Sequence, residues 1–259
     1  MSQWLILLQK ELLENVRNFK WIWVPLVFII LAIQQPITMY YMPQILESVG
    51  GLPEGAVFDF PVPSAEEVLA TSLTQYNSLG VLIIVLITMG VIAAERKSGV
   101  AAMILVKPVS YTSFVTSKWF SVLLLVWASY FIGYLGAWYY TGVLFEFVSF
   151  SIFMQSFLMY GVWLTFVLTF TVFLNTFLKS SGLIAFISLG SIIIMSLISS
   201  ILSNALSWSP ALLGGYVTEF IMFAQMPDGA VISMVVSIAV IGIMLLLSVL
   251  LFRKNELAE

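Results

Sequence analysis

The sequence of 259 residues contains no cysteine and no histidine. The lack of cysteine excludes disulfide bonds and thiolate chemistry, and the lack of histidine excludes histidine-ligated metal sites. Charged residues are scarce, at 9% of the chain against 61% hydrophobic residues, whereas a soluble domain is about one quarter charged. The net charge of −3 argues against nucleic-acid binding, and the composition as a whole indicates a membrane protein.

Apolar runs of about 20 residues recur along the chain, and each is long enough to cross a hydrocarbon core of about 30 Å. A membrane barrel would instead show strictly alternating segments of about 10 residues, and the sequence has none. We therefore expect an all-α, polytopic membrane protein that forms a single domain over residues 1–259. The six predicted spans cover residues 21–41, 73–94, 119–140, 150–177, 182–202 and 230–252.

The first residues, 2–19, have the pattern of an amphipathic helix that lies in the membrane interface rather than spanning it. The helix either only orients the first span or also contacts a cytoplasmic partner, and the sequence leaves both readings open. Its apolar residues recur every three or four positions, at Trp4, Leu8, Leu12, Val16 and Phe19.

Two connecting segments are interrupted by proline and glycine. Residues 42–70 are predicted to form an acidic extracellular loop, in which Ser64 and Glu67 have the spacing of a capping box and predict a helix from about Ala65. Residues 203–229 are too interrupted to span the membrane, so we expect a short re-entrant or extracellular helix before the last span.

The distribution of charge predicts the orientation. All ten lysine and arginine residues fall in alternate connecting segments, and eight of the thirteen acidic residues fall in the others. The positive-inside rule then places both termini in the cytoplasm of a multi-pass protein of the cell membrane. The same rule places residues 95–118 on the cytoplasmic side.

The chain lacks the residues that would drive transport or catalysis by itself. No predicted span has an ionisable residue near its middle, which argues against an ion-coupled transporter. There is no carboxylate pair at depth for a membrane hydrolase. No phosphate-binding motif G-x-x-x-x-G-K-[ST] occurs. We therefore expect a non-enzyme that binds no cofactor and takes its driving chemistry from a partner.

The longest basic interruption between two spans is the segment 95–118. It begins with Glu95-Arg-Lys-Ser-Gly99, continues through an apolar run to Lys107-Pro108-Val109-Ser110, and ends at Lys118. This order resembles the permease subunits of the ABC-2 superfamily of ATP-binding-cassette transporters, in which the pattern E-[RK]-x-x-G precedes an apolar helix, P-[VI]-S and a short helix ending near G-K. Ser117 stands where the family usually has glycine, and Tyr111 where it often has arginine.

The resemblance implies the permease subunit of an export-type transporter. Two separate ATPase subunits would bind ATP and magnesium, and a second permease copy or a paralogue would complete the complex within the membrane lipid. Residues 110–117 would form a short docking helix, with Pro108 fixing the turn before it. The residues implied in ATPase docking and coupling are Glu95, Arg96, Lys97, Gly99, Lys107, Pro108, Val109, Ser110, Tyr111 and Phe114.

Two other readings compete with this one. The segment 95–118 could be a solvated loop whose cations only set the topology, although such a loop has no reason to contain an apolar helix followed by Pro-Val-Ser. The whole chain could also be a stand-alone membrane interaction, sensor or immunity protein that holds a cytoplasmic partner.

A possible substrate path is formed by three amide side chains, Gln34, Gln35 and Asn175. Next to Pro36, the two glutamines are more commonly the mark of a helix kink with interhelical hydrogen bonds. The sequence does not name a cargo. A lipid-like, peptide or other amphiphilic cargo is compatible with the absence of a charged cavity.

Overall fold

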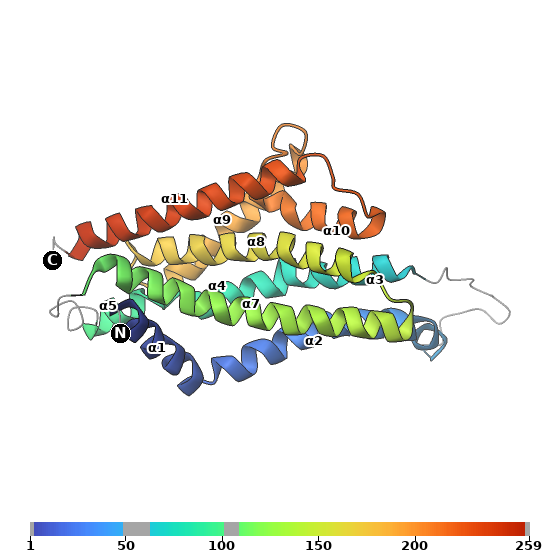
Figure 1. The fold of residues 1–259 in the computed structure, drawn as a ribbon, viewed down its shortest axis with the longest axis horizontal. Helices are drawn as coiled ribbons and strands as arrows, with labels where there is room; N and C mark the ends of the chain where they lie inside the picture. Colours follow the sequence, from blue (N-terminus) through green and yellow to red (C-terminus); the bar gives the residue numbers. More distant parts are fainter. Residues whose placement is uncertain (1–2, 49–62, 101–108, 257–259) are drawn as a thin grey trace.

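The computed structural model describes residues 3–48, 63–100 and 109–256, and every regular element in these ranges is helical. Six helices are long and apolar enough to cross a membrane, which confirms the all-α class with six spans. The helices lie alongside one another in an elongated bundle (Figure 1). The spans are α2 (Lys20–Ser48), a composite second span, α7 (Tyr111–Leu144), α8 (Phe150–Asn175), α9 (Ser181–Ile201) and α11 (Ala230–Glu256).

The second span is composite because a π-helix and a break interrupt its α-helix. It consists of α3 (Ala65–Gln75), the π-helix η1 (Tyr76–Gly80), α4 (Val81–Thr88) and α5 (Ala93–Ser98). The predicted helix start at Ala65 is confirmed, and Ser64 is its N-cap, since the Ser64 hydroxyl accepts a hydrogen bond from the Glu67 N–H at 3.2 Å.

The two ends of the bundle differ in charge. Both ends of the described chain lie at the same end of the bundle, together with α5 and the start of α7 (Figure 1). We call this the basic end, because the described lysine and arginine residues lie on elements that begin or finish there or, for Lys179, in the connection between α8 and α9. The opposite end, where α7 gives way to α8, is called the acidic end.

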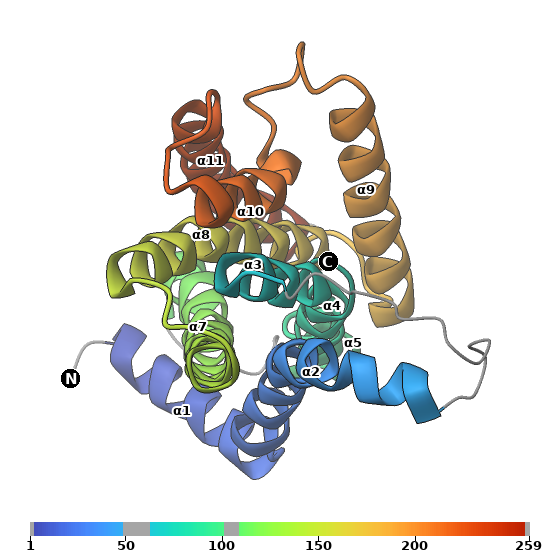
Figure 2. The same cartoon turned by 90° about the vertical axis from the view of Figure 1, so that its right-hand side faces the viewer.

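The centre of the bundle is α8. In the most apolar window of each span, 72% of α8 is buried inside the protein, against 22% of α9 and 17% of α11. Helix α9 stands apart from the rest when the bundle is viewed along its length (Figure 2). The two peripheral spans therefore present most of their surface to the surroundings.

Helices α2 and α7 approach each other closely at Gly133. A Cβ atom at this position would lie 2.7 Å from the Phe28 carbonyl oxygen and 2.5 Å from the Tyr76 hydroxyl, so only glycine fits. Ser129, Gly133 and Ala137 recur every four residues, a spacing that predicts a small-residue face for close helix packing. Ser129 and Ala137 are buried, which confirms this face.

The third span differs most from its prediction. A separate docking helix over 110–117 was expected before a span at 119–140, but α7 runs without interruption from Tyr111 to Leu144. Ser110 caps it, since its hydroxyl accepts the N–H of Ser113 at 3.1 Å. The prediction of a separate helix was wrong because the cation at Lys118, taken as a boundary, is neutralised inside the bundle.

The connecting segments also shift. Helix α2 continues to Ser48 and α3 begins at Ala65, so both ends of the predicted loop 42–70 are helical. A short helix before the last span is present as η2 (Pro210–Leu212) and α10 (Leu213–Phe223), and α10 packs on α3 and α8.

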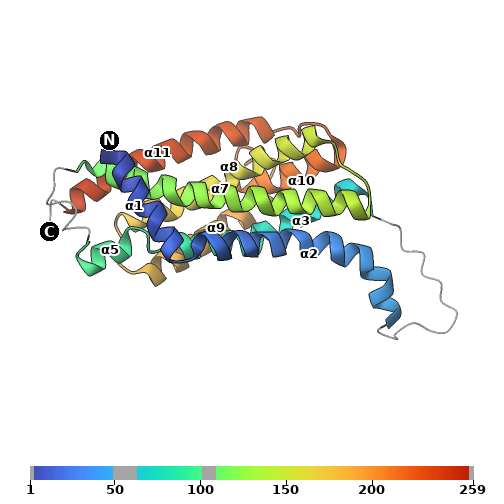
Figure 3. The same cartoon turned by 60° about the horizontal axis from the view of Figure 1, so that its bottom comes forward.

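The N-terminal helix α1 (Gln3–Arg17) crosses α7 obliquely at the basic end (Figure 3). The apolar residues predicted to face the membrane interface divide between two sides. Leu8 is buried in the protein with Glu11 and Asn15, whereas Val16 and Phe19 are 53% and 66% exposed. Helix α1 therefore turns Leu8 and two polar side chains toward the protein and leaves other apolar side chains, such as Leu13 and Val16, exposed.

Candidate functional site

The second span breaks between α4 and α5, at residues 89–92, and Asn175 at the end of α8 closes the break. Its side-chain oxygen accepts hydrogen bonds from the backbone N–H groups of Ile92 at 3.3 Å and Ala93 at 3.2 Å. Its amide nitrogen donates to the carbonyl oxygens of Thr88 at 3.2 Å and Thr171 at 2.8 Å. Asn175 is fully buried, so one amide replaces backbone bonds that the break has removed.

Beyond the break, α5 carries Glu95 into a group of ionised side chains that we call the charged joint. The joint consists of Lys10, Glu11 and Glu14 from α1, Glu95 from α5 and Lys118 from α7. Helix α1 lies far from the other two helices in the sequence. The joint therefore fixes α5 to α1 and α7 at the basic end.

Lys118 is the most enclosed member of the joint, with a side chain only 2% exposed. Its ammonium lies 2.8 Å from a Glu11 oxygen and 2.9 Å from a Glu95 oxygen. A buried charge costs several kcal/mol unless it is paired, and removing one partner of a buried pair costs about 3–5 kcal/mol. Two carboxylates are thus what allows a lysine to lie inside this helix bundle.

Lys10 pairs with the same two carboxylates from the outer side. It lies 2.9 Å from Glu11 and 3.5 Å from Glu14, and it donates a hydrogen bond to Glu95. Burial alone would lower the pKa of Lys10, but the hydrogen bonds and negative charges of Glu95 and Glu11 outweigh burial and raise it. Lys10 is therefore charged at neutral pH.

Two neutral hydrogen bonds extend the contact between α1 and α7. The Trp4 indole donates to the Thr116 hydroxyl at 3.0 Å, and the Asn15 amide donates to the Ser121 hydroxyl at 2.9 Å. Together with the joint, they hold α1 along its length.

The carboxylates of Glu11, Glu14 and Glu95 lie within 4.8 Å of one another, close enough to share a metal ion. The ammonium groups of Lys10 and Lys118 already supply the compensating charge. The three carboxylates therefore belong to an ion-pair network.

Several predicted docking residues face the protein instead of the solvent. Phe114 is buried and stacks on Phe252 at 5.1 Å between ring centroids, and Tyr111 meets the same ring at 6.0 Å. The Arg96 guanidinium lies 5.9 Å from the Phe252 ring centroid and donates to the Thr176 carbonyl oxygen at 3.1 Å. These three residues therefore anchor the basic end to α8 and α11.

Other predicted residues line the outer surface of the basic end. Lys97 and Ser110 are exposed, Val109 is partly exposed, and Gly99 ends α5 with a left-handed φ of 77°. Lys107 and Pro108 lie outside the described residues. The structure thus brings Glu95 and Lys118 together in the joint and leaves Lys97 and Ser110 accessible.

A second feature lies deeper in the bundle, on the composite span. Thr74, Asn77 and Ser78 are exposed, and so is Gln34 on the neighbouring α2, while Gln35 is partly buried. We call the four exposed residues the polar band. The position of Tyr76 indicates how far these residues lie from the start of the first span. The Tyr76 hydroxyl donates a hydrogen bond to the Phe28 carbonyl oxygen at 2.8 Å. Phe28 lies about 10 Å along α2 from Trp21.

The polar band was only partly visible in the sequence. Gln34 was identified, but Thr74, Asn77 and Ser78 were not, since the π-helix that carries Asn77 and Ser78 has no simple sequence pattern. In the contact between α1 and α7, Glu11 and Asn15 were also missed. Their spacing from Leu8, three and then four further residues, was the available signal for an inward face.

The fold, with six apolar spans and a charged joint at one end, defines a multi-pass helical membrane protein. The chain belongs to the family described as "Protein of unknown function (DUF2705)", whose model matches residues 24–258. It is 34% identical over 256 residues to the "Uncharacterized transmembrane protein YxlG" of Bacillus subtilis (strain 168), covering 99% of each chain. The similarity to a transmembrane protein extends through the whole architecture.

Proposed function

We propose that this chain is the permease subunit of an ATP-binding-cassette transporter that exports an amphiphilic substrate and is powered by separate ATPase subunits. The observation that carries the proposal is the charged joint. It ties α5, at the foot of a broken span, to α1 and α7 through buried ion pairs. A partner that displaced the segment after α5 would therefore move three helices together.

The path of such a movement can be followed residue by residue. Displacement of α5 passes through Glu95 to Lys118 on α7 and to Lys10 on α1. It also passes through Asn175 to α8, because that side chain bonds both sides of the break. Rigid helices joined by such contacts rock as bodies rather than bending.

The polar band supports a translocation path. Polar side chains facing hydrocarbon are costly, and those found at membrane depth usually face a bundle interior or a water-filled cavity. In a single copy, Gln34, Asn77 and Ser78 are exposed. A second permease copy placed against α2 and the composite span would cover them and create an aqueous path, to which Gln35 would contribute.

Asn175 takes a different role in this account from the one expected. Its amide oxygen and nitrogen are both hydrogen-bonded within the protein. We assign it to the joint between α4, α5 and α8 rather than to the substrate path.

The ATPase surface would be the exposed part of the basic end around Lys97 and Ser110, together with the segment that contains Lys107 and Pro108. ATP and magnesium would be held by the ATPase alone. Both termini and this surface would face the cytoplasm of the cell membrane. Because the chain has no cysteine, single-cysteine variants test the orientation: Asp228→Cys should react with an impermeant maleimide outside, and Ser98→Cys only after lysis.

Co-purification with a cognate ATPase tests the function directly. Purified alone, the chain should show no ATP hydrolysis, and co-expressed with the ATPase it should form a complex with two copies of each subunit. Lys97→Glu should weaken assembly, whereas Lys254→Glu, at the same end on α11, should not. Capture of a cytoplasmic protein without ATPase motifs, with no ATPase in the complex, would instead support a stand-alone interaction protein.

A further inference from the structure

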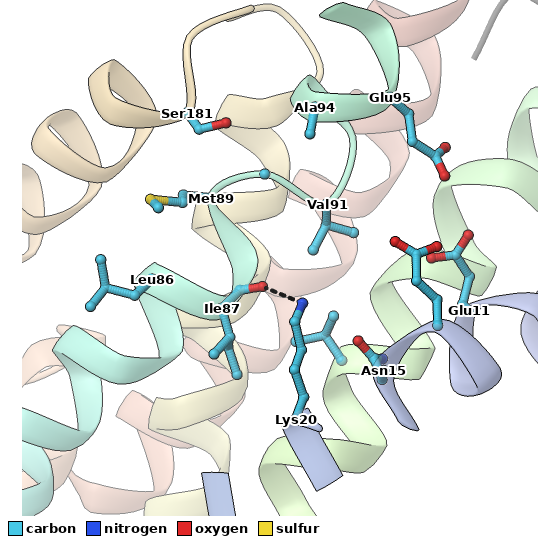
Figure 4. A pocket seen from close by; sticks show the side chains of 13 residues that line it. Glu11, Asn15, Lys20, Leu86, Ile87, Met89, Val91, Ala94, Glu95 and Ser181 are labelled. Carbon is cyan, nitrogen blue, oxygen red and sulfur yellow. Dashed lines mark hydrogen bonds between the residues drawn. The ribbon is translucent and has the colours of Figure 1, made fainter. Parts of the chain in front are cut away.

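A cavity of about 250 Å³ lies beside the charged joint, between α1, α2, the break in the second span and the start of α9 (Figure 4). One liquid water occupies about 30 Å³, so the cavity has room for a group of several heavy atoms. Its wall combines apolar side chains such as Leu86 and Ile87 with polar ones. The polar lining consists of Glu11, Glu14, Asn15, Lys20, Glu95 and Ser181.

The charged side chains around the cavity differ in how closely they are paired with other groups. Glu11 and Glu95 are paired with Lys118 at 2.8 and 2.9 Å. Glu14 lies 3.5 Å from Lys10 with half of its side chain exposed. Among the described residues, Lys20 makes one long hydrogen bond, to the Ile87 carbonyl oxygen at 3.5 Å. The cavity therefore offers one ammonium and one carboxylate with unused hydrogen-bonding capacity.

The cavity lies at the depth of the lipid headgroups. Lys20 begins the first span directly before Trp21 and Trp23, and aromatic residues of this kind mark the interface. The exposed apolar residues of α1, among them Leu13 and Val16 at 49% and 53%, face the same layer. Leu86 at the cavity wall is 45% exposed, so apolar surface continues from the cavity toward the hydrocarbon.

We propose that this cavity binds the headgroup of a membrane aminophospholipid, with its phosphate against Lys20 and its primary ammonium against Glu14. The acyl chains would lie along Leu86. An anionic lipid without an amine would bring a negative charge close to Glu14 with no ammonium of its own to pair with that carboxylate, and a simple cation would meet the positive charge of Lys20. The bound lipid would bridge the start of α2 and the break in the second span.

Lipid titration of the purified full-length chain tests this proposal, and it requires no ATPase, so its outcome is separate from that of the proposed function. Native mass spectrometry would measure binding of phosphatidylethanolamine, phosphatidylcholine and phosphatidylglycerol with identical acyl chains. Phosphatidylethanolamine should bind most tightly. Lys20→Gln should weaken its binding about tenfold, as expected for loss of one charge-assisted hydrogen bond, and Lys20→Arg should restore most of the affinity.

Three controls separate the headgroup site from general lipid adhesion. Arg17→Gln removes a cation from exposed α1 surface outside the cavity and should change nothing. Ser181→Leu should block binding by filling the cavity rim without changing charge, which keeps the test valid if Lys20→Gln folds poorly. Soluble glycerophosphoethanolamine, which has the headgroup but no acyl chains, should compete weakly. Equal affinity for the three lipids, or equal losses in Lys20→Gln and Arg17→Gln, would overturn the proposal.

Discussion

The charged joint and the tyrosine core hold helices together in different ways. The tyrosine core comprises four fully buried rings at the centre of the bundle: Tyr76, Tyr130, Tyr134 and Tyr160. These rings contact one another in stacked, tilted and edge-to-face pairs. They also contact neighbouring phenylalanines, as Tyr130 does by stacking on Phe157 at 4.9 Å between ring centroids. The joint instead depends on full charges, of which Lys118 is almost completely enclosed.

The difference concerns how the contact energy is divided. In the tyrosine core, the stabilisation is the sum of many ring contacts that are each small, and each hydroxyl contributes only a modest free energy. In the joint, each charge is stable only while its partners are present. The tyrosine core is therefore suited to hold helices together as one rigid unit. The charged joint is suited to connect separate helices that move together.

The largest expected effect is that of Lys118→Met. It leaves Glu11 and Glu95 with only Lys10 between them, so we expect a loss of about 3–5 kcal/mol in the free energy of unfolding. Reversible unfolding in mixed micelles would measure it. Lys97→Met removes an exposed cation from the same end and should change stability by less than about 0.5 kcal/mol.

The double variant Lys118→Met/Glu95→Gln sharpens this result. Removing one carboxylate relieves the repulsion left by the first change, so the double variant should be less destabilised than the sum of the two single variants by about 1 kcal/mol or more. Simple additivity would mean that the joint is not a coupled network.

Asn175→Leu should have the next largest effect, of about 2–4 kcal/mol, because two backbone N–H groups lose their acceptor inside the bundle. Thermal unfolding monitored by size-exclusion chromatography would detect it. Asn204→Leu, at an exposed position, is the matched control. If both variants unfold alike, the break does not depend on the Asn175 amide.

Hydroxyl removal in the tyrosine core should have small effects of differing sign. Tyr134→Phe deletes a hydrogen bond with Ser156 of 2.8 Å and should cost about 1 kcal/mol. The Tyr130 hydroxyl has no hydrogen-bond partner among the described residues, so Tyr130→Phe should leave stability unchanged or raise it. An equal loss of unfolding free energy in Tyr130→Phe and Tyr134→Phe would contradict the different hydrogen bonding of the two hydroxyls.

The smallest effect concerns pH. The pKa of Lys10 is raised above its ordinary value of 10.5, so its stabilisation is complete below that pH and is lost only as the pH rises through the higher value in the folded protein. The difference in unfolding free energy between the native chain and Lys10→Met should therefore stay constant from about pH 7 to 9. A steady decrease across that range would contradict the pairing of Lys10.

Local signals in the sequence predicted local features well. The Ser64 cap, the six apolar spans and the small-residue face at Gly133 follow from spacing and composition, and the structure confirms all three. The opposite distribution of cations and acids correctly indicated that the basic segments gather at one end of the bundle.

Features set by distant partners were missed. In the sequence, Glu11 and Lys118 look like solvent-facing charges. In the structure they are ion-pair partners, although 107 residues separate them. The break at residues 89–92 contains no proline that would indicate it in the sequence. It depends on the side-chain amide of Asn175, more than 80 residues further along the chain. Hydrophobic periodicity cannot reveal such contacts, because it ranks a paired charge and an unpaired one alike.

The central claim is that the charged joint moves the polar band. It can be tested without knowing the substrate by measuring the reaction of Ser78→Cys with a water-soluble maleimide in the complex with its ATPase. A thiol reacts as the thiolate and so needs water; Ser78→Cys should react, whereas Leu197→Cys on the exposed, apolar face of α9 should not. ATP binding should change the Ser78→Cys rate several-fold, and Glu95→Gln should abolish that change. An unreactive Ser78→Cys, or an ATP response unaffected by Glu95→Gln, would contradict the account.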